Sequence, residues 1–125
     1  MESRRDHALL YDGDCGFCRL SVRTLLRLDR DERLRPVVIQ SPEGERLLGE
    51  VPAEFRLASF HLVTPGGTVV SGAEAAPILA RLIPGGEVPA RAMRRFPGAT
   101  GATYAFISRH RGMLGRIGFR AGPIE

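Results

Sequence analysis

The feature that most constrains this chain is its pair of cysteines, Cys15 and Cys18, which are the only cysteines among its 125 residues. An apolar segment at 8–11 precedes them and runs into Asp12-Gly13, a pattern typical of a buried strand that ends in a loop. A helical pattern begins directly after the first cysteine. The sequence therefore predicts a strand, a short loop and a helix, with a Cys-x-x-Cys motif where the helix starts.

The predicted helix over 16–29 is amphipathic, with an apolar side and a stripe of arginines three or four residues apart. Asp14 or Cys15 occupies its N-cap position, where Asp is a preferred residue. The ordinary interpretation of the stripe is a solvated helix face. The more specific interpretation is a surface on which anionic groups dock, for example the carboxylates of glutathione. The apolar side holds Cys18, Val22, Leu25 and Leu26, and the stripe holds Arg19, Arg23, Arg27 and Arg30.

The remaining pattern gives the order β-α-β-α-β-β-α, followed by a helical, Arg-rich C-terminal tail. This order predicts an α/β fold of the thioredoxin-like type, a three-layer sandwich with a mixed central sheet and flanking helices. The length suits a single domain, 1–125, in which the Gly and Pro clusters at 84–89 and 97–101 are expected to be loops. The further predicted strands are 34–40, 57–64 and 68–71, the last two joined by Pro65-Gly66-Gly67, and the further helices are 42–48 and 73–83.

The position of the cysteine pair indicates thiol–disulfide exchange. A helix N-terminus presents unpaired N–H groups and the positive end of the helix dipole, which favour a thiolate, the species that attacks a disulfide. We therefore expect Cys15 to be the exposed nucleophile. Cys18, one turn further along and on the apolar side, is expected to be covered and to resolve the mixed disulfide. The spacing brings the two sulfurs within reach of each other.

Other interpretations of the pair are inert thiols and a metal site. A structural zinc ion takes four ligands, and beyond the two cysteines the sequence offers only His7, His61 and His110. His61 falls within a predicted strand, where a histidine with satisfied hydrogen bonds is the ordinary expectation. We expect no metal and no cofactor.

Two carboxylates flank the motif and have open roles. Asp14 is either a plain N-cap or a residue that tunes the cysteines, since a like charge opposes thiolate formation. Asp12 either makes an Asx-type turn or accepts the proton of Cys18 during resolution. The apolar strand followed by Asp-x-Asp also resembles haloacid-dehalogenase phosphatases. That chemistry needs a later lysine, or occasionally an arginine, and a downstream acidic pair, and this chain has no lysine and no Asp after Asp31.

Residues 10–18, Leu-Tyr-Asp-Gly-Asp-Cys-Gly-Phe-Cys, resemble the motif of the DCC family of thiol–disulfide oxidoreductases. The similarity continues at 62–64, at 71–76 and at 104–111, and so covers nearly the whole chain. It implies a thioredoxin-like fold and a protein-disulfide reductase type of activity. One departure from ordinary thioredoxins is at 57–60, where no proline stands in place of their cis-proline.

Charge and location complete the expectations. Residues 88–125 hold seven arginines and one acidic residue, Glu125, a net charge of +6. The alternative function is therefore a non-catalytic thioredoxin-like binding module with a basic C-terminal surface. No export signal or membrane span is visible, so the cytoplasm is the expected location. The expected partners are a disulfide-containing protein or small-thiol substrate and an electron-donating reductant; nucleic acid is not expected, because no binding motif is present.

Overall fold

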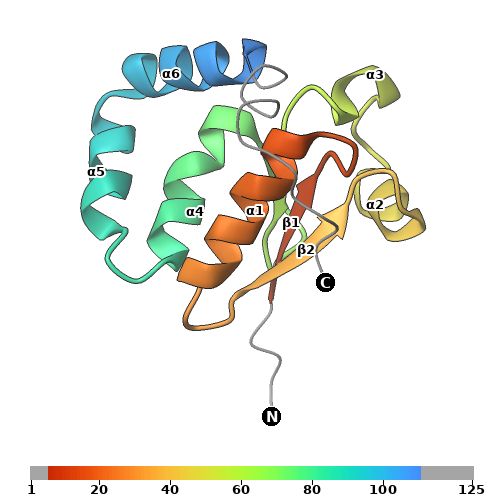
Figure 1. Cartoon of the computed structure of the whole chain (residues 1–125), viewed down its shortest axis with the longest axis horizontal. Coiled ribbons are helices and arrows are strands. Elements are labelled where there is room, and N and C mark those ends of the chain that lie inside the picture. Colours follow the sequence, from red (N-terminus) through yellow and green to blue (C-terminus); the bar gives the residue numbers. More distant parts are fainter. Residues whose placement is uncertain (1–5, 111–125) are drawn as a thin grey trace.

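The computed structural model describes residues 6–110, which form a mixed four-stranded sheet with helices on both faces (Figure 1). The strand order is β2-β1-β3-β4. The first strand is parallel to β2 and antiparallel to β3, and β3 and β4 form an antiparallel hairpin. The strands are β1 His7–Tyr11, β2 Leu34–Val38, β3 His61–Val63 and β4 Val69–Ser71.

The helices build the outer layers. Two of them, α1 Gly16–Leu28 and α4 Ala76–Leu82, pack on one face of the sheet, and α2 Pro42–Leu47 packs on the other. The two C-terminal helices lie outside this sandwich, with α6 running across the ends of α1 and α4 (Figure 1). The remaining elements are α3 Ala53–Arg56, a short 3-10 helix at Gly72–Glu74, α5 Glu87–Arg95 and α6 Pro97–Arg109. This is the three-layer α/β architecture that the sequence predicts.

The strand before the cysteine motif is buried on both sides. Leu9 and Tyr11 belong to the core beneath α1 and α4, while Ala8 and Leu10 belong to the core beneath α2. A central strand covered on both faces is expected to be continuously apolar. Burial of each such leucine contributes about 1.5–3 kcal/mol. The end of β1 is therefore a firm support for the loop that carries the motif.

The predicted strand at 57–64 is too long. Only His61–Val63 is a strand, and the short helix α3, which we did not predict, precedes it. Pro52 is the N-cap of α3, and Ala53 and Glu54 favour the first helical turn. The predicted helix at 73–83 is also divided. Gly72 follows β4 with φ of +57°, a conformation that favours glycine, and a 3-10 turn comes before α4.

The predicted loops at 84–89 and 97–101 are mostly wrong. Of the residues in these two clusters, only 84–86 lie outside helices, because α5 begins at Glu87 and α6 begins at Pro97. Proline is favoured at the first position of a helix, where its missing N–H costs nothing. The described part of the expected C-terminal tail is helical, while residues 111–125 lie outside the described residues. Within 6–110, no helix is long and apolar enough to cross a membrane.

Candidate active site

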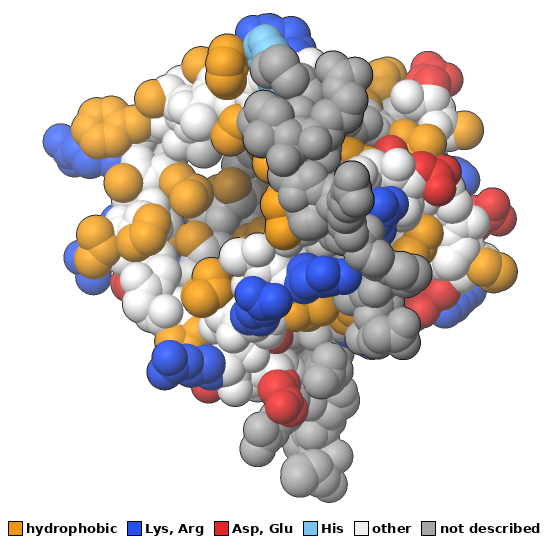
Figure 2. Space-filling view, viewed as in Figure 1, with side chains coloured by type: hydrophobic (Ala, Val, Ile, Leu, Met, Phe, Trp, Pro, Cys, Tyr) orange, Lys and Arg blue, Asp and Glu red, His pale blue; other side chains and the backbone are white. Residues whose placement is uncertain are grey.

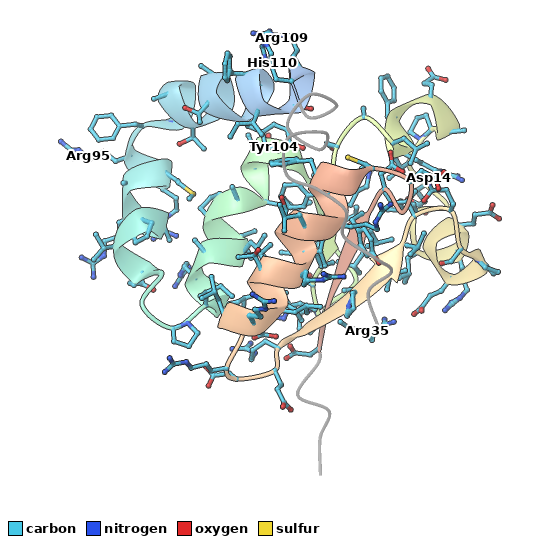
Figure 3. The ribbon with its side chains drawn as sticks, viewed as in Figure 1. Asp14, Arg35, Arg95, Tyr104, Arg109 and His110 are labelled. Atoms are coloured by element: carbon cyan, nitrogen blue, oxygen red, sulfur yellow. The ribbon has the colours of Figure 1, made fainter. Side chains whose placement is uncertain are left out.

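The loop between β1 and α1 is a tight turn closed by Asp12. Its Oδ1 accepts a hydrogen bond from the backbone N–H of Asp14 at 2.9 Å, and its carbonyl oxygen accepts one from the N–H of Cys15 at 3.3 Å. The predicted Asx-type turn is thereby confirmed. Gly13 fits against β2, since a Cβ at this position would lie 2.8 Å from a methyl group of Val38. The side chain of Asp14 is exposed (Figure 3).

Cys15 is the N-cap of α1. Its backbone is extended, and its Sγ accepts a hydrogen bond from the backbone N–H of Cys18 at 3.2 Å. Of the two N-cap candidates, the structure therefore selects Cys15 over Asp14. A sulfur in this position faces the positive end of the helix dipole and receives an N–H group that would otherwise lack a partner within the helix.

The two cysteines are not joined in a disulfide, and both are half-buried. The expected contrast, with Cys15 exposed and Cys18 covered, is wrong, because both side chains have intermediate exposure. The cysteines differ in their surroundings instead. Cys15 is held at the helix terminus by the loop, whereas Cys18 lines an apolar cavity.

Gln40 is a site residue that the sequence analysis missed. Its Nε2 donates to Oδ1 of Asp12 at 2.8 Å, and its Oε1 accepts from the backbone N–H of Gly13 at 3.1 Å. The pairing of β1 and β2 extends one bond further, from the N–H of Ile39 to the carbonyl of Tyr11 at 2.9 Å, which brings Gln40 to the motif. The signal that could have found it is topological, since adjacent parallel strands end at the same edge of a sheet.

Arg19 turns back to the same loop. Its Nη1 donates to the carbonyl oxygen of Gly13 at 2.8 Å. This arginine therefore stabilises the loop of the motif and is not simply part of a solvated helix face. The other arginines over α1 contribute the basic side chains seen there in Figure 2. Burial raises the pKa of Tyr11 above its ordinary value of 10, and the charge of Arg19 opposes that change. Tyr11 therefore keeps its hydroxyl proton at neutral pH.

An apolar cavity of about 170 Å³ lies beside Cys18. Tyr104 reaches it from α6 (Figure 3) and contacts the ring of Phe60, with 5.9 Å between ring centroids. Phe60 belongs to the segment 57–60, which holds no proline and, like the rest of the described chain, no cis peptide bond. Leu9, Leu79 and other apolar side chains complete the lining. The cavity is lined from α1 by Phe17, Cys18 and Ser21, and from α6 by Tyr104, Ile107 and Ser108.

His61 has the structural role that its place in the sequence indicates. It is buried, with Nδ1 2.6 Å from the hydroxyl of Ser71 and Nε2 2.8 Å from the carbonyl oxygen of Arg56. Burial lowers the pKa of His61, and the hydrogen bond to Arg56 partly offsets this effect. Both ring nitrogens are used in holding α3 to the hairpin. Among residues 6–110, no three His, Cys, Asp or Glu side chains are grouped so that they could hold a metal ion.

A mixed sheet whose central strand leads into a Cys-x-x-Cys helix N-terminus defines a class of protein, the thiol–disulfide oxidoreductases with a thioredoxin-like fold. The family model described as DCC1-like thiol-disulfide oxidoreductase matches residues 9–117, and the chain belongs to this family. The resemblance noted in the sequence is thereby confirmed. Comparisons with curated proteins and with solved structures found no match. The chain is thus an enzyme of thiol–disulfide chemistry, with thiols or disulfides as substrates.

Proposed function

We propose that this protein is a disulfide reductase in which Cys15 attacks the substrate and Cys18 resolves the mixed disulfide. The observation that carries the proposal is the hydrogen bond from the N–H of Cys18 to the Sγ of Cys15, 3.2 Å long, at the N-terminus of α1. It supports Cys15 as the attacking sulfur, because the N-terminus of the helix faces this atom. The proposed catalytic unit is one thioredoxin-like domain, 1–125.

The first step is attack by the Cys15 thiolate on one sulfur of the substrate disulfide. A new S–S bond forms as the substrate S–S bond breaks, and the departing sulfur leaves as a thiolate that takes a proton from water. In the second step Cys18 loses its proton and attacks Cys15, which releases the second substrate thiol. The substrate gains two electrons and two protons, and the protein is left with a Cys15–Cys18 disulfide. A reductant outside the chain must return it to the dithiol.

The carboxylates have proposed roles in this cycle. Asp12 is the proposed acceptor for the Cys18 proton, and one of its oxygens already anchors the loop through Asp14 and Gln40. Asp14 adds negative charge next to Cys15, so its proposed role is to limit how far the thiolate is favoured. We place the cycle in the cytoplasm, because a cysteine pair that must be returned to the dithiol needs a reducing compartment.

Single-turnover reduction tests this proposal. The fully reduced protein is mixed with insulin, and free substrate thiols are counted against the loss of protein thiols. We expect two substrate thiols for each Cys15–Cys18 disulfide formed, and no reduction by a Cys15→Ser variant. A redox titration of the pair then separates turnover from structure. A potential in the range of cytosolic reductases supports the proposal, while a potential below about −300 mV is that of a structural disulfide.

A binding function has one observation in its favour. Arg91, Arg94 and Arg95 are exposed on α5, close in sequence to the exposed apolar residues Val88 and Phe96. Figure 2 shows hydrophobic side chains exposed over α5 and its junction with α6. A basic surface with exposed apolar side chains suits an acidic protein partner. Such a partner could be the reductant or a substrate, so this second candidate is compatible with the first.

A further inference from the structure

We propose that the cavity beside Cys18 is a specificity pocket for an uncharged apolar group, the size of one aromatic ring, that the substrate carries next to its disulfide. This inference rests on the proposed function and names its substrate class. The same chemistry is met in a peptide with Phe beside its half-cystine and in a small aryl-alkyl disulfide. The experiment below includes both sources.

The place of the cavity ties it to the cysteine pair. Phe17 and Cys18, which belong to the motif, both contribute to its lining. A substrate in the mixed disulfide is bonded to the Sγ of Cys15, and this atom is 3.2 Å from the backbone nitrogen of Cys18. A group only a few bonds from the substrate sulfur is therefore held beside the cavity. The group next to the substrate sulfur is therefore the expected occupant of the cavity, because the reaction brings it to this position through a covalent bond.

The lining selects the chemistry of the occupant. Among the described residues around the cavity none is charged, and those with a hydroxyl group are Tyr11, Ser21, Tyr104 and Ser108. Transfer of an unpaired carboxylate or ammonium group from water into such surroundings is strongly unfavourable. The raised pKa of Tyr11 agrees with a poorly hydrated interior in which Tyr11 stays neutral. The pocket therefore excludes charged neighbours of a disulfide, including those of glutathione.

The volume of the cavity limits the size of the group that it can hold. The volume of about 170 Å³ is close to that of an apolar cavity that binds benzene, which is about 150 Å³. A phenyl ring fits, whereas an indole would need the lining to move. Burial of an apolar group of this size in a specificity pocket changes kcat/KM by roughly 10- to 100-fold. Part of the lining comes from α6, which lies outside the sandwich and supplies Tyr104, Ile107 and Ser108. Substitutions on α6 can therefore change the size of the cavity.

The test uses the full chain and matched disulfides. Three peptide disulfides differ only in the residue beside the half-cystine, which is Phe, Ala or Glu, and benzyl methyl disulfide is the small aryl-alkyl source. Bis(2-hydroxyethyl) disulfide and glutathione disulfide serve as substrates without an apolar group. We expect the Phe peptide to exceed the Ala peptide in kcat/KM by roughly 10- to 100-fold and the Glu peptide to be slower than both. Benzyl methyl disulfide should exceed bis(2-hydroxyethyl) disulfide.

Substitutions inside and outside the cavity test whether the preference for Phe arises there. Ser108→Leu fills the cavity from α6, and Ala105→Leu makes a larger change at an exposed position of the same helix that is outside the lining. We expect Ser108→Leu to reduce the Phe-to-Ala ratio to below about 3-fold. Ala105→Leu should keep the full ratio. Should Ser108→Leu fail to fold, Ser21→Leu fills the same cavity from α1.

A binding measurement separates this inference from the proposed function. Benzyl alcohol is titrated into the oxidised protein, and NMR shifts of Ser21, Tyr104 and Ser108 are followed. Saturable shifts that Ser108→Leu abolishes support the pocket even if no disulfide is reduced, in which case only the reductase proposal fails. Equal kcat/KM for the Phe, Ala and Glu peptides, or an absence of shifts with benzyl alcohol, overturns the pocket and leaves the reductase proposal standing.

Discussion

Gln40, which follows β2, holds Asp12 of the cysteine loop through a 2.8 Å hydrogen bond across 28 residues of sequence. The same amide accepts from the N–H of Gly13 at 3.1 Å, so both halves of one side chain stabilise the turn that precedes Cys15. The edge strand of the sheet thereby fixes the geometry of the motif. The contact is exposed and lies where two parallel strands end. It therefore stabilises the loop and not the hydrophobic core.

The first prediction is that Gln40→Ala loosens this loop. Each of the two hydrogen bonds contributes about 0.5–1.5 kcal/mol, so the free energy of unfolding should fall by about 1–3 kcal/mol. The rate at which Cys15 is alkylated should also change, because its backbone N–H bonds to Asp12 within the same turn. Urea unfolding and iodoacetamide labelling in a Cys18→Ser background measure the two effects.

Gln40→Glu sharpens this test. It keeps the size of the side chain and the acceptor for Gly13 but replaces the donor to Asp12 by a second carboxylate. We expect it to be at least as disruptive as Gln40→Ala. Glu50→Gln, at an exposed position, is the control and should leave both measurements unchanged. Normal alkylation in both Gln40 variants would show that the loop holds its geometry without the amide.

The junction of β1 and α1 could be predicted because its signals are local. An apolar run, an Asp-Gly turn and a helical pattern meet within a dozen residues, and the predicted helix start at 16 agrees with α1. The hairpin at Pro65-Gly66-Gly67 is confirmed for the same reason. Gln40 could not be found in this way, since its role depends on the register of two strands far apart in sequence.

The cavity and its helices were also beyond the sequence patterns. Composition alone favoured loops near Gly98 and Gly101, yet both lie inside α6, whose start at Pro97 follows the rule already applied to Pro42. Tyr104 lines the cavity because α6 packs across the ends of α1 and α4. That placement comes from tertiary packing, which periodicity along one helix does not specify.

The second prediction concerns pH and His61. Burial lowers the pKa of His61 below its ordinary value of 6.5 in the folded state. Between the two pKa values the unfolded chain binds a proton that the folded chain does not. His61 therefore contributes stability that is present above about pH 6.5 and is lost as the pH falls through its folded pKa, with a slope of up to about 1.4 kcal/mol per pH unit.

Urea unfolding from pH 7.5 to 5 measures this contribution. His61→Gln should be less stable at every pH, since both hydrogen bonds of the ring are disturbed. The decisive quantity is the slope of the unfolding free energy with pH, which should become flatter by up to one proton in His61→Gln. Parallel slopes for the wild type and His61→Gln would contradict a neutral, buried His61.

The third prediction concerns metal. The protein purified without added zinc should contain far less than one equivalent, because two cysteines offer only half the ligands of a structural site. Both nitrogens of His61 already have partners within the fold. Elemental analysis of the purified protein measures the content. Stoichiometric zinc that is lost together with the fold on chelation would replace the redox interpretation with a metal site.

The fourth prediction concerns the basic surface on α5. Reversal of Arg94 and Arg95 to Glu should weaken binding to an acidic partner and flatten the dependence of that binding on salt. Single-turnover reduction of bis(2-hydroxyethyl) disulfide should be unchanged. Reversal of the exposed Arg27 and Arg30 gives the same change in net charge near α1 and should leave the partner bound.

Pull-down with the double variant at several salt concentrations makes the comparison. Equal loss of binding in both double variants would mean that the total charge matters and that α5 is not the docking surface. Loss of binding only in the Arg27 and Arg30 variant would show that the acidic partner binds near α1 and not on α5. Full binding by both would leave the basic charge without a role in recognition.

The last prediction assigns roles within the cysteine pair. The two thiols are both half-buried, so exposure does not distinguish them. Their positions on α1 do, because the Sγ of Cys15 caps the helix and accepts the N–H of Cys18. Cys15 should therefore be alkylated first near neutral pH, as measured by mass spectrometry of the digested protein. A Cys18→Ser variant should form mixed disulfides that it cannot resolve, and a Cys15→Ser variant should form none.

Trapping from a mixture of disulfide-containing proteins, followed by non-reducing electrophoresis, compares the two variants. Ser59→Ala, with both cysteines intact, serves as a control that should release substrate and accumulate no adduct. Equal trapping by both cysteine variants would falsify the assignment of nucleophile and resolver while leaving exchange chemistry in place. Trapping by neither, together with slow alkylation of both thiols, would remove the catalytic role of the pair. The helix terminus would then serve only to cap α1 with a sulfur.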